Sequence, residues 1–174
     1  MLKAYANLLT RRSCRSYDGV QITDRELDDI LKAGEYAPTG KGGQSPMMVV
    51  LQKKADVLSY QKMNAKVNGN ENAQTFYGAP TVIIVFGDKT SPFCLDDANL
   101  VIGNMLNAAN ALGVDSCYIW RAKEVFNTDE GKALMAKWGV PDNFMGVGNV
   151  ILGYGKEGGK REPLPRKKNY VIKI

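Results

Sequence analysis

The chain has 174 residues, of which 44% are hydrophobic and 24% are charged. These values are close to those of ordinary globular proteins, and they exclude a disordered or fibrous protein. The length suits one domain, so we expect a single domain over residues 1–174. No apolar run approaches the roughly 18 to 20 residues that a membrane span requires, so we expect a cytoplasmic protein with no membrane partner.

The sequence contains no histidine. Because histidine is the commonest general base and the commonest metal ligand, its absence excludes Ser-His-Asp and Cys-His catalysis. The three cysteines, Cys14, Cys94 and Cys117, form no Cys-x-x-Cys motif, so the sequence indicates neither a metal site nor a disulfide framework. An enzyme of this composition would depend on a bound cofactor for its difficult chemistry.

The net charge of +5 is concentrated at the end of the chain, where seven basic residues oppose two acidic ones in residues 153–174. Such a segment fits a nucleic acid, a membrane surface or the phosphate of a small ligand. Aromatic residues are not interleaved with these charges as stacking platforms, so we do not expect a nucleic-acid partner.

The first half of the chain predicts two helices and two strands. Thr23-Asp24-Arg25-Glu26 has the pattern of a capping box, so a helix begins there and ends near Ala37, before Pro38. A glycine-rich loop over 39–46 leads into a strand over 47–51. A helix over 55–67 and a buried, β-branched strand over 81–86 follow.

The second half begins with the longest predicted helix, over 95–112, where Asp96 and Asp97 are expected to cap the first turn. Its apolar surface extends round most of the cylinder, as in a helix buried in a core or an oligomer interface. Further elements are predicted as a strand over 114–120, a helix over 128–138, a strand over 146–154 and an edge strand over 170–174.

Two glycine motifs for nucleotides are excluded. The residues 153–158 match Gly-x-Gly-x-x-Gly after a strand, but prolines follow where the motif requires a helix, and the chain has no Walker-type sequence. A different anion site is indicated by residues 11–15, which concentrate three arginines near a serine. Guanidinium groups offer paired donors that suit a phosphate.

Several short motifs, in a fixed order over nearly the whole chain, resemble those of the FMN-dependent nitroreductase family. No single motif is specific, but their order and spacing together are. They are Arg11-Arg12-Ser13-Cys14-Arg15, Ala37-Pro38-Thr39-Gly40, Gln44-Ser45-Pro46, Gly78-Ala79-Pro80, Ala111-Leu112-Gly113-Val114, Ser116-Cys117-Tyr118-Ile119, Ile151-Leu152-Gly153-Tyr154 and Pro165-Arg166-Lys167.

The resemblance implies an α+β fold, a three-layer sandwich whose central mixed, mainly antiparallel sheet is flanked by helices. It implies a homodimer that exchanges its C-terminal strands and binds FMN tightly at the interface. The implied activity is hydride transfer from NADH or NADPH through FMN N5 to a small flat electrophile, by a ping-pong mechanism. Nitroaromatics, quinones, flavins and unsaturated carbonyls are the candidate acceptors. Two alternatives stay open: a flavin-dependent dehydrogenase of another small substrate, and, more distantly, a basic nucleic-acid-binding module.

The resemblance also implies the residues that bind FMN. Those at the phosphate and the ribityl chain are Arg11, Arg12, Ser13 and Arg15, joined at the phosphate by Arg166 and Lys168. Those in the loop that the partner subunit contributes to the isoalloxazine ring are Pro38, Thr39, Gly40 and Gln44. Those whose backbone lies against the N5 edge are Ile119, Trp120 and Arg121. No side chain is assigned as a catalytic acid or base.

Three features of the site are left open at this stage. An asparagine of the middle segment contacts the flavin in some relatives, and Asn64, Asn68 and Asn72 are equal candidates for that position. Gly42 and Gly43 stand where similar sequences have asparagine and arginine. Trp120 either packs in the core or forms a wall of the flavin site.

Overall fold

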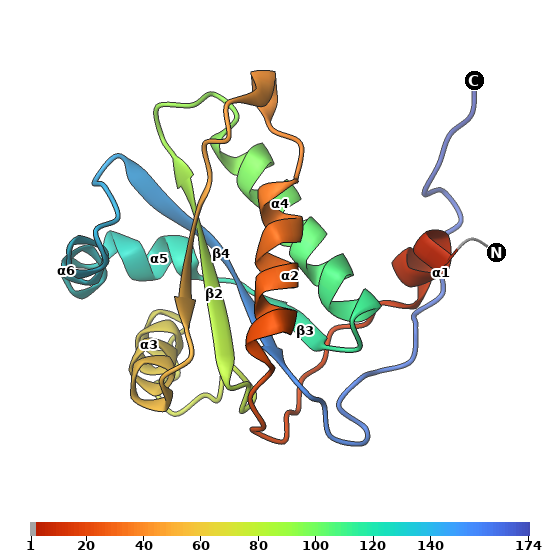
Figure 1. Ribbon diagram of the computed structural model, residues 1–174, viewed down its shortest axis with the longest axis horizontal. Coiled ribbons are helices and arrows are strands. Elements are labelled where there is room, and N and C mark those ends of the chain that lie inside the picture. Colours follow the sequence, from red (N-terminus) through yellow and green to blue (C-terminus); the bar gives the residue numbers. More distant parts are fainter. Residues whose placement is uncertain (1–2) are drawn as a thin grey trace.

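A four-stranded sheet forms the centre of the structure, a computed structural model that describes residues 3–174 (Figure 1). Its strands are β1 (Met47–Leu51), β2 (Thr81–Asp88), β3 (Asp115–Ile119) and β4 (Phe144–Gly153). They lie in the order β1-β2-β4-β3, and every neighbouring pair is antiparallel. The sheet predicted as mixed but mainly antiparallel is therefore antiparallel in each of its three strand pairs.

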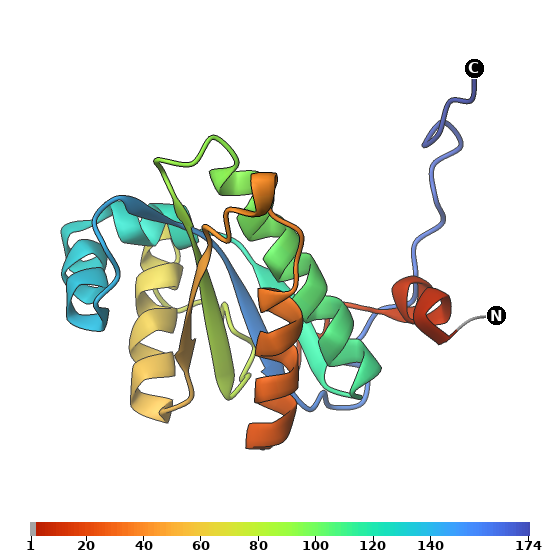
Figure 2. The same ribbon diagram turned by 45° about the horizontal axis from the view of Figure 1, so that its top comes forward.

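Helices cover both faces of this sheet, which gives three layers (Figures 1 and 2). One face carries α2 (Asp24–Glu35) and α4 (Cys94–Ala111). The other carries α3 (Lys54–Val67), α5 (Ala122–Asn127) and α6 (Asp129–Trp138). The predicted α+β architecture with helices on both sides of the sheet is confirmed.

The side chains of β2 show why the sheet separates two cores. Val82, Ile84 and Phe86 pack on the face of α3, α5 and α6, whereas Ile83 and Val85 pack on the face of α2 and α4. All five are fully buried. Since successive strand residues point to opposite faces, a strand that is apolar at every position is one that is covered on both sides.

Local sequence signals fix several boundaries. The capping box is present: the Thr23 hydroxyl accepts from the Glu26 N–H, and the Glu26 carboxylate accepts from the Thr23 N–H. The first element of the described residues is the short helix α1 (Lys3–Thr10), and a 3₁₀ turn, η1 (Gly40–Gly42), follows α2. The helix α5 was not predicted, because its six residues are too few to show a helical period.

The end of the chain leaves the body of the structure (Figures 1 and 2). In this single chain, residues 170–174 form no strand, and Tyr170, Val171 and Ile172 are exposed. A strand exchanged between two protomers therefore stays a prediction. Among the helices of residues 3–174, none is long and apolar enough to cross a membrane.

Candidate functional site

Residues 11–15 lie along the outer edge of β3. Ser13 forms a parallel bridge with Ser116, and the N–H of Cys14 donates to the Ser116 carbonyl at 3.0 Å. On the other side, the N–H of Arg15 donates to the Gly159 carbonyl at 2.8 Å. Contacts on two sides thus fix the backbone of this segment.

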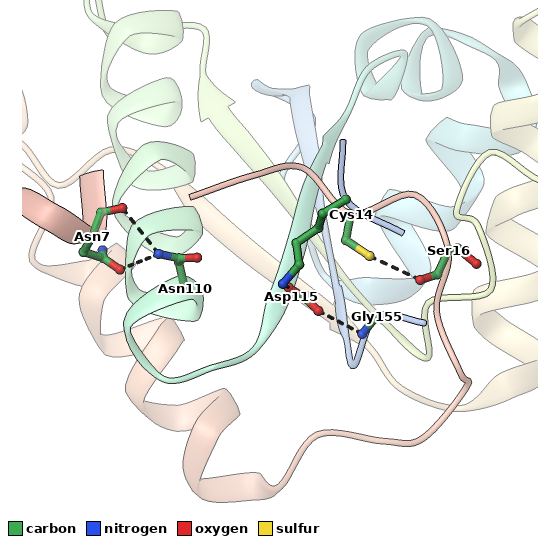
Figure 3. A network of polar contacts seen from close by, with 7 residues as sticks. Asn7, Cys14, Ser16, Asn110, Asp115 and Gly155 are labelled. Atoms are coloured by element: carbon green, nitrogen blue, oxygen red, sulfur yellow. Dashed lines mark hydrogen bonds and ion pairs between the residues drawn. The ribbon is translucent and has the colours of Figure 1, made fainter. Parts of the chain in front are cut away.

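Polar contacts anchor the elements on either side of this segment (Figure 3). Asn7 of α1 donates through Nδ2 to the Asn107 carbonyl of α4 at 2.9 Å, and Asn110 Nδ2 donates to Asn7 Oδ1 at 2.6 Å. At the start of β3, the Asp115 carboxylate accepts from the Gly155 N–H at 2.9 Å. The helix α1 is thus attached to the C-terminal half of α4.

Arg11, Ser13 and Arg15 gather around the thiol of Cys117, a buried residue of β3. Burial raises the pKa of Cys117, and a hydrogen bond with Ser13 and the charges of Arg15 and Arg11 oppose that rise. Arg11 Nη1 is buried and has no hydrogen-bond partner within residues 3–174. Because a buried donor without an acceptor costs about 1–3 kcal/mol, an anion bound beside Arg11 would be stabilised.

Arg12 points elsewhere. Its Nη1 donates to the carbonyls of Leu9 and Arg11, both at 2.8 Å. It therefore gives a hydrogen-bond partner to the Leu9 carbonyl, which lies in the last turn of α1. Of the four predicted phosphate residues, three therefore act on the Cys117 thiol, and the guanidinium of the fourth turns back to the end of α1.

Two buried amides hold the loop that follows β3. The carbonyl oxygen of Trp120 accepts from Asn64 Nδ2 at 2.9 Å and from Asn149 Nδ2 at 3.3 Å. Asn149 Nδ2 also donates to the Ile119 carbonyl at 3.0 Å. Both asparagines are buried, at 1% and 0% exposure. The two lone pairs of this carbonyl are thus both occupied from the inside of the protein.

Tyr60 fixes the direction of one of these amides. Its hydroxyl donates to Asn149 Oδ1 at 2.7 Å, which leaves Nδ2 to face the loop. The Tyr60 ring packs against Phe76 and Phe126, with ring centres 5.5 and 5.7 Å apart. Burial raises the pKa of Tyr60 far above its usual range, so the hydroxyl stays a neutral donor.

Arg121 has a backbone conformation that non-glycine residues rarely adopt, with φ at 76°. Within residues 3–174, the other such residues are Lys41, Gln44 and Tyr77. Left-handed backbone costs an ordinary residue roughly 1–2 kcal/mol, so it persists only where surrounding contacts impose it. Arg121, Lys41 and Gln44 lie in the segments from which the predicted site is built, whereas Tyr77 lies outside them.

The side chains of Trp120 and Arg121 form one unit at the surface. The Arg121 guanidinium carbon lies 4.4 Å from the centre of the Trp120 ring, and Arg121 Nη1 lies 3.0 Å from Glu124 Oε1. Trp120 is 62% exposed. Core packing of Trp120, one of the two alternatives from the sequence, is therefore wrong for this chain.

A surface depression of about 220 Å³ joins these features. It is lined by Arg15, Asn64, Asn68, Thr75, Tyr77, Cys117, Tyr118, Ile119, Trp120 and Arg121. The oxygen Thr75 Oγ1 is buried and unpartnered within residues 3–174.

Two of the three candidate asparagines line the depression, whereas Asn72 lies outside it. Asn149 was missed, although a lone asparagine within an apolar strand is itself a sign of a required hydrogen bond.

The loop that contains Pro38, Thr39, Gly40 and Gln44 lies at the other end of α4 (Figure 1). The Gly40 N–H donates to Asp97 Oδ1 at 2.8 Å, and Ser45 Oγ donates to Asp97 Oδ2 at 3.2 Å. The expectation that Asp97 caps α4 is wrong: the helix begins without a side-chain cap, and Asp97 binds this loop instead. Since 18 residues of helix span about 27 Å, one chain does not bring this loop to residues 11–15.

Arg166 and Lys168 lie in the exposed C-terminal segment. The Arg166 guanidinium donates to the Leu164 carbonyl two residues before it. Within residues 3–174, neither side chain is hydrogen-bonded to residues 11–15.

A larger cavity, with a volume of about 650 Å³, lies elsewhere in the described chain. It opens between the start of α3 and the loop before β2, and glutamines and lysines form its polar lining. It contains none of the predicted site residues and no buried unpartnered atom. Size alone therefore does not identify the site, and the smaller depression beside β3 has the stronger chemistry.

The sequence profile described as "Nitroreductase family" matches residues 8–154. A protein of Archaeoglobus fulgidus with the provisional name NADH dehydrogenase/NAD(P)H nitroreductase is 32% identical over 156 residues, which cover 86% of this chain and 84% of the relative.

Solved structures agree with this match. A nitroreductase with bound FMN from Bacteroides fragilis aligns over 100% of both chains, with a TM-score of 0.89 and 28% identity. A nitroreductase with bound FMN from Desulfitobacterium hafniense aligns over 100% of this chain and 99% of its own, with a TM-score of 0.86 and 22% identity. The second likeness shows the fold alone.

Proposed function

The chain belongs to the nitroreductase family, and from that premise we propose that it is an FMN-dependent oxidoreductase that takes electrons from NADH or NADPH. The chain as a whole would then form one FMN-binding domain. Its electron acceptor would be a small flat electrophile such as a nitroaromatic, a quinone, a flavin or an unsaturated carbonyl.

The observation that carries the proposal is the unpartnered, buried Nη1 of Arg11 beside Ser13 and Arg15. The phosphate of FMN has a charge of nearly minus two and several acceptor oxygens, so it fits a site with two guanidinium groups and one hydroxyl. The depression along residues 117–121 is also lined by Arg15, so a ligand held at its phosphate by Arg15 would extend along these residues. The residues present therefore fit the cofactor.

FMN, when bound, would supply the hydride chemistry at its N5 atom, first with NADH or NADPH and then with the acceptor. The chain's own task is to bind and orient. Arg11, Ser13 and Arg15 would hold the phosphate, and the fixed backbone of Ile119, Trp120 and Arg121 would face the ring. The exposed Trp120 and Arg121 would form a flat, cationic wall beside it.

A second copy of the chain would complete the site. Pro38, Thr39, Gly40 and Gln44 lie too far from residues 11–15 to share one cofactor within a chain, so the loop would come from the other protomer. Exposed apolar side chains on α1 and α4 support this arrangement, as do those of the C-terminal segment: Leu8, Leu9, Leu95, Leu100, Tyr170, Val171 and Ile172. In such a dimer, Arg166 and Lys168 would close on the phosphate, and residues 170–174 would add a strand to the partner's sheet.

The direct test is to purify the protein, identify any released flavin, and add NADH or NADPH without oxygen. We expect a yellow protein that releases FMN and loses its flavin colour rapidly with at least one of the two donors. A colourless protein that takes up no FMN would refute the proposal. Slow bleaching with both donors would favour a flavin-dependent dehydrogenase of another substrate.

A further inference from the structure

The peptide between Trp120 and Arg121 is held by side chains from two separate elements, Asn64 of α3 and Asn149 of β4. We propose that these two amides form a clamp that holds the peptide in a strained orientation and keeps the Arg121 N–H available to the ring edge of a flavin. The inference rests on the proposed function for the identity of the ligand. Its conformational part stands on this chain alone.

The direction of the N–H follows from peptide geometry. In a trans peptide, the N–H points opposite to the C=O. The Trp120 carbonyl points at the buried amides, so the Arg121 N–H points away from them. It has no acceptor within residues 3–174. A ring-edge acceptor on a bound ligand would satisfy it, and the N5 atom and the C4 carbonyl oxygen of oxidised flavin are such acceptors.

The positive φ of Arg121 indicates that the clamp opposes the backbone preference of this residue. Turning this peptide by half a rotation would take Arg121 from a φ of 76° into the negative region that ordinary residues prefer. The same rotation would break both bonds to the Trp120 oxygen, leave Asn64 Nδ2 buried without an acceptor, and leave Asn149 Nδ2 with the Ile119 carbonyl alone. The observed orientation is the one that the asparagines select, against the preference of Arg121 itself.

Tyr60 extends the clamp by one residue. Because its hydroxyl donates to Asn149 Oδ1, the Asn149 amide cannot rotate its oxygen toward the loop without losing that bond. Asn149 and Tyr60 are thus positioning residues, which act on the ligand through the backbone of residues 119–121, and Asn64 holds the same backbone while also lining the depression.

The first test is conformational and needs no ligand. Crystal structures of Asn64→Ala and of the Asn64→Ala/Tyr60→Phe double variant report the φ of Arg121. Both changes avoid the centre of the sheet, where Asn149→Ala risks the fold. We expect a negative φ in both variants. A φ that stays positive in Asn64→Ala would show that the amides do not impose it, which overturns the inference.

The second test measures the affinities of FMN and riboflavin by fluorescence quenching. Loss of the clamp acts at the ring, which both ligands share, so we expect both affinities to fall about tenfold in Asn64→Ala while their ratio keeps its wild-type value. Asn104→Ala is the matched control, since Asn104 makes the same kind of side-chain bond, to the Ala33 carbonyl at 3.0 Å, far from the depression. It should change neither affinity.

The outcomes separate the two claims. If the FMN affinity in Asn64→Ala equals that of the control, or if the ratio of FMN to riboflavin affinity collapses because the whole site is disturbed, the inference is wrong. If the wild-type protein binds neither flavin, the proposed function fails, and the structures of the variants still decide whether the clamp exists.

Discussion

Asp97 of α4 accepts a hydrogen bond from the backbone N–H of Gly40 at 2.8 Å, across 57 positions of the sequence. The carboxylate is 2% exposed, and its second oxygen accepts from Ser45. One buried side chain therefore ties both ends of the loop that we assign to the flavin of the other protomer. The shape of this loop is determined by the long helix beneath it.

Replacing Asp97 by alanine should release the loop. Loss of both bonds leaves the Gly40 N–H without its acceptor, so we expect a loss of about 1–3 kcal/mol in the free energy of unfolding. Trypsin should also cleave faster after Lys41, within the freed loop. Asp97→Asn is the control, since its amide oxygen still accepts from Gly40. Equal cleavage rates in wild type and Asp97→Ala would contradict this account.

Gly40 itself tolerates no side chain. A Cβ at this position would lie 2.1 Å from a carbon of the Phe93 ring, so Gly40→Ala should destabilise the protein by about 1–3 kcal/mol in urea unfolding. Gly103→Ala, in the interior of α4 with nothing within 4 Å, should instead stabilise the protein by about 0.5–1 kcal/mol. The same sign for both substitutions would refute the contact with Phe93.

The folded protein should lose stability in acid as Glu26 becomes protonated. Hydrogen bonds from the Thr23 hydroxyl and N–H, and then from Tyr154, lower the pKa of Glu26 in the folded state. A lowered folded pKa contributes stability above the ordinary glutamate pKa of about 4.3, and that stability is lost as the pH falls through the folded value. Thermal melting between pH 7 and 3 should therefore show a weaker acid dependence in Glu26→Gln than in wild type. Glu35→Gln, on the same helix, should behave as wild type; parallel curves for all three proteins would contradict the role of Glu26.

Local chemistry explains which elements could be predicted. The Thr23 to Glu26 capping box lies within four residues, and the sequence locates it without knowledge of the fold. Asp97 sits in the first turn of a helix, where a local interpretation is a cap, but its partner Gly40 is distant in sequence and hidden from any local pattern. The hydrogen bonds from Asn64 and Asn149 to the Trp120 carbonyl also join residues that are distant in sequence, so no local pattern indicates them. The short α5 begins directly after Arg121, whose φ no sequence pattern indicates.

Dimer formation and flavin binding should be lost together. Deleting residues 170–174 removes the segment that we expect to pair with the partner's sheet, so the truncated protein should be a monomer with little FMN and a lower melting temperature. Lys173→Ala, which alters the same segment without shortening it, is the control. Light scattering with flavin quantification measures both properties, and a truncated monomer with full FMN content would exclude the shared site.

Individual basic residues should differ in their effect on FMN affinity. A hydrogen bond to a charged group contributes on the order of 1.5–3 kcal/mol, so Arg11→Ala, Arg15→Ala and Arg166→Ala should each weaken FMN roughly tenfold or more. Lys156→Ala is the matched control, because Lys156 is exposed and lies outside the site. Lys160 is unsuitable, since its Nζ pairs with Asp115 at 2.8 Å. Equal affinities for all of these variants would show that the phosphate lies elsewhere.

We expect Arg11, Ser13 and Arg15 to recognise the phosphate of a flavin. Riboflavin lacks only that phosphate, so the ratio of FMN to riboflavin affinity isolates the contribution of these residues. Titrating both ligands into the apo forms of wild type and Arg15→Ala measures it directly. Wild type should prefer FMN by at least about tenfold, and Arg15→Ala should lose most of that preference while its riboflavin affinity is unchanged. Equal affinities of wild type for FMN and riboflavin would contradict the claim.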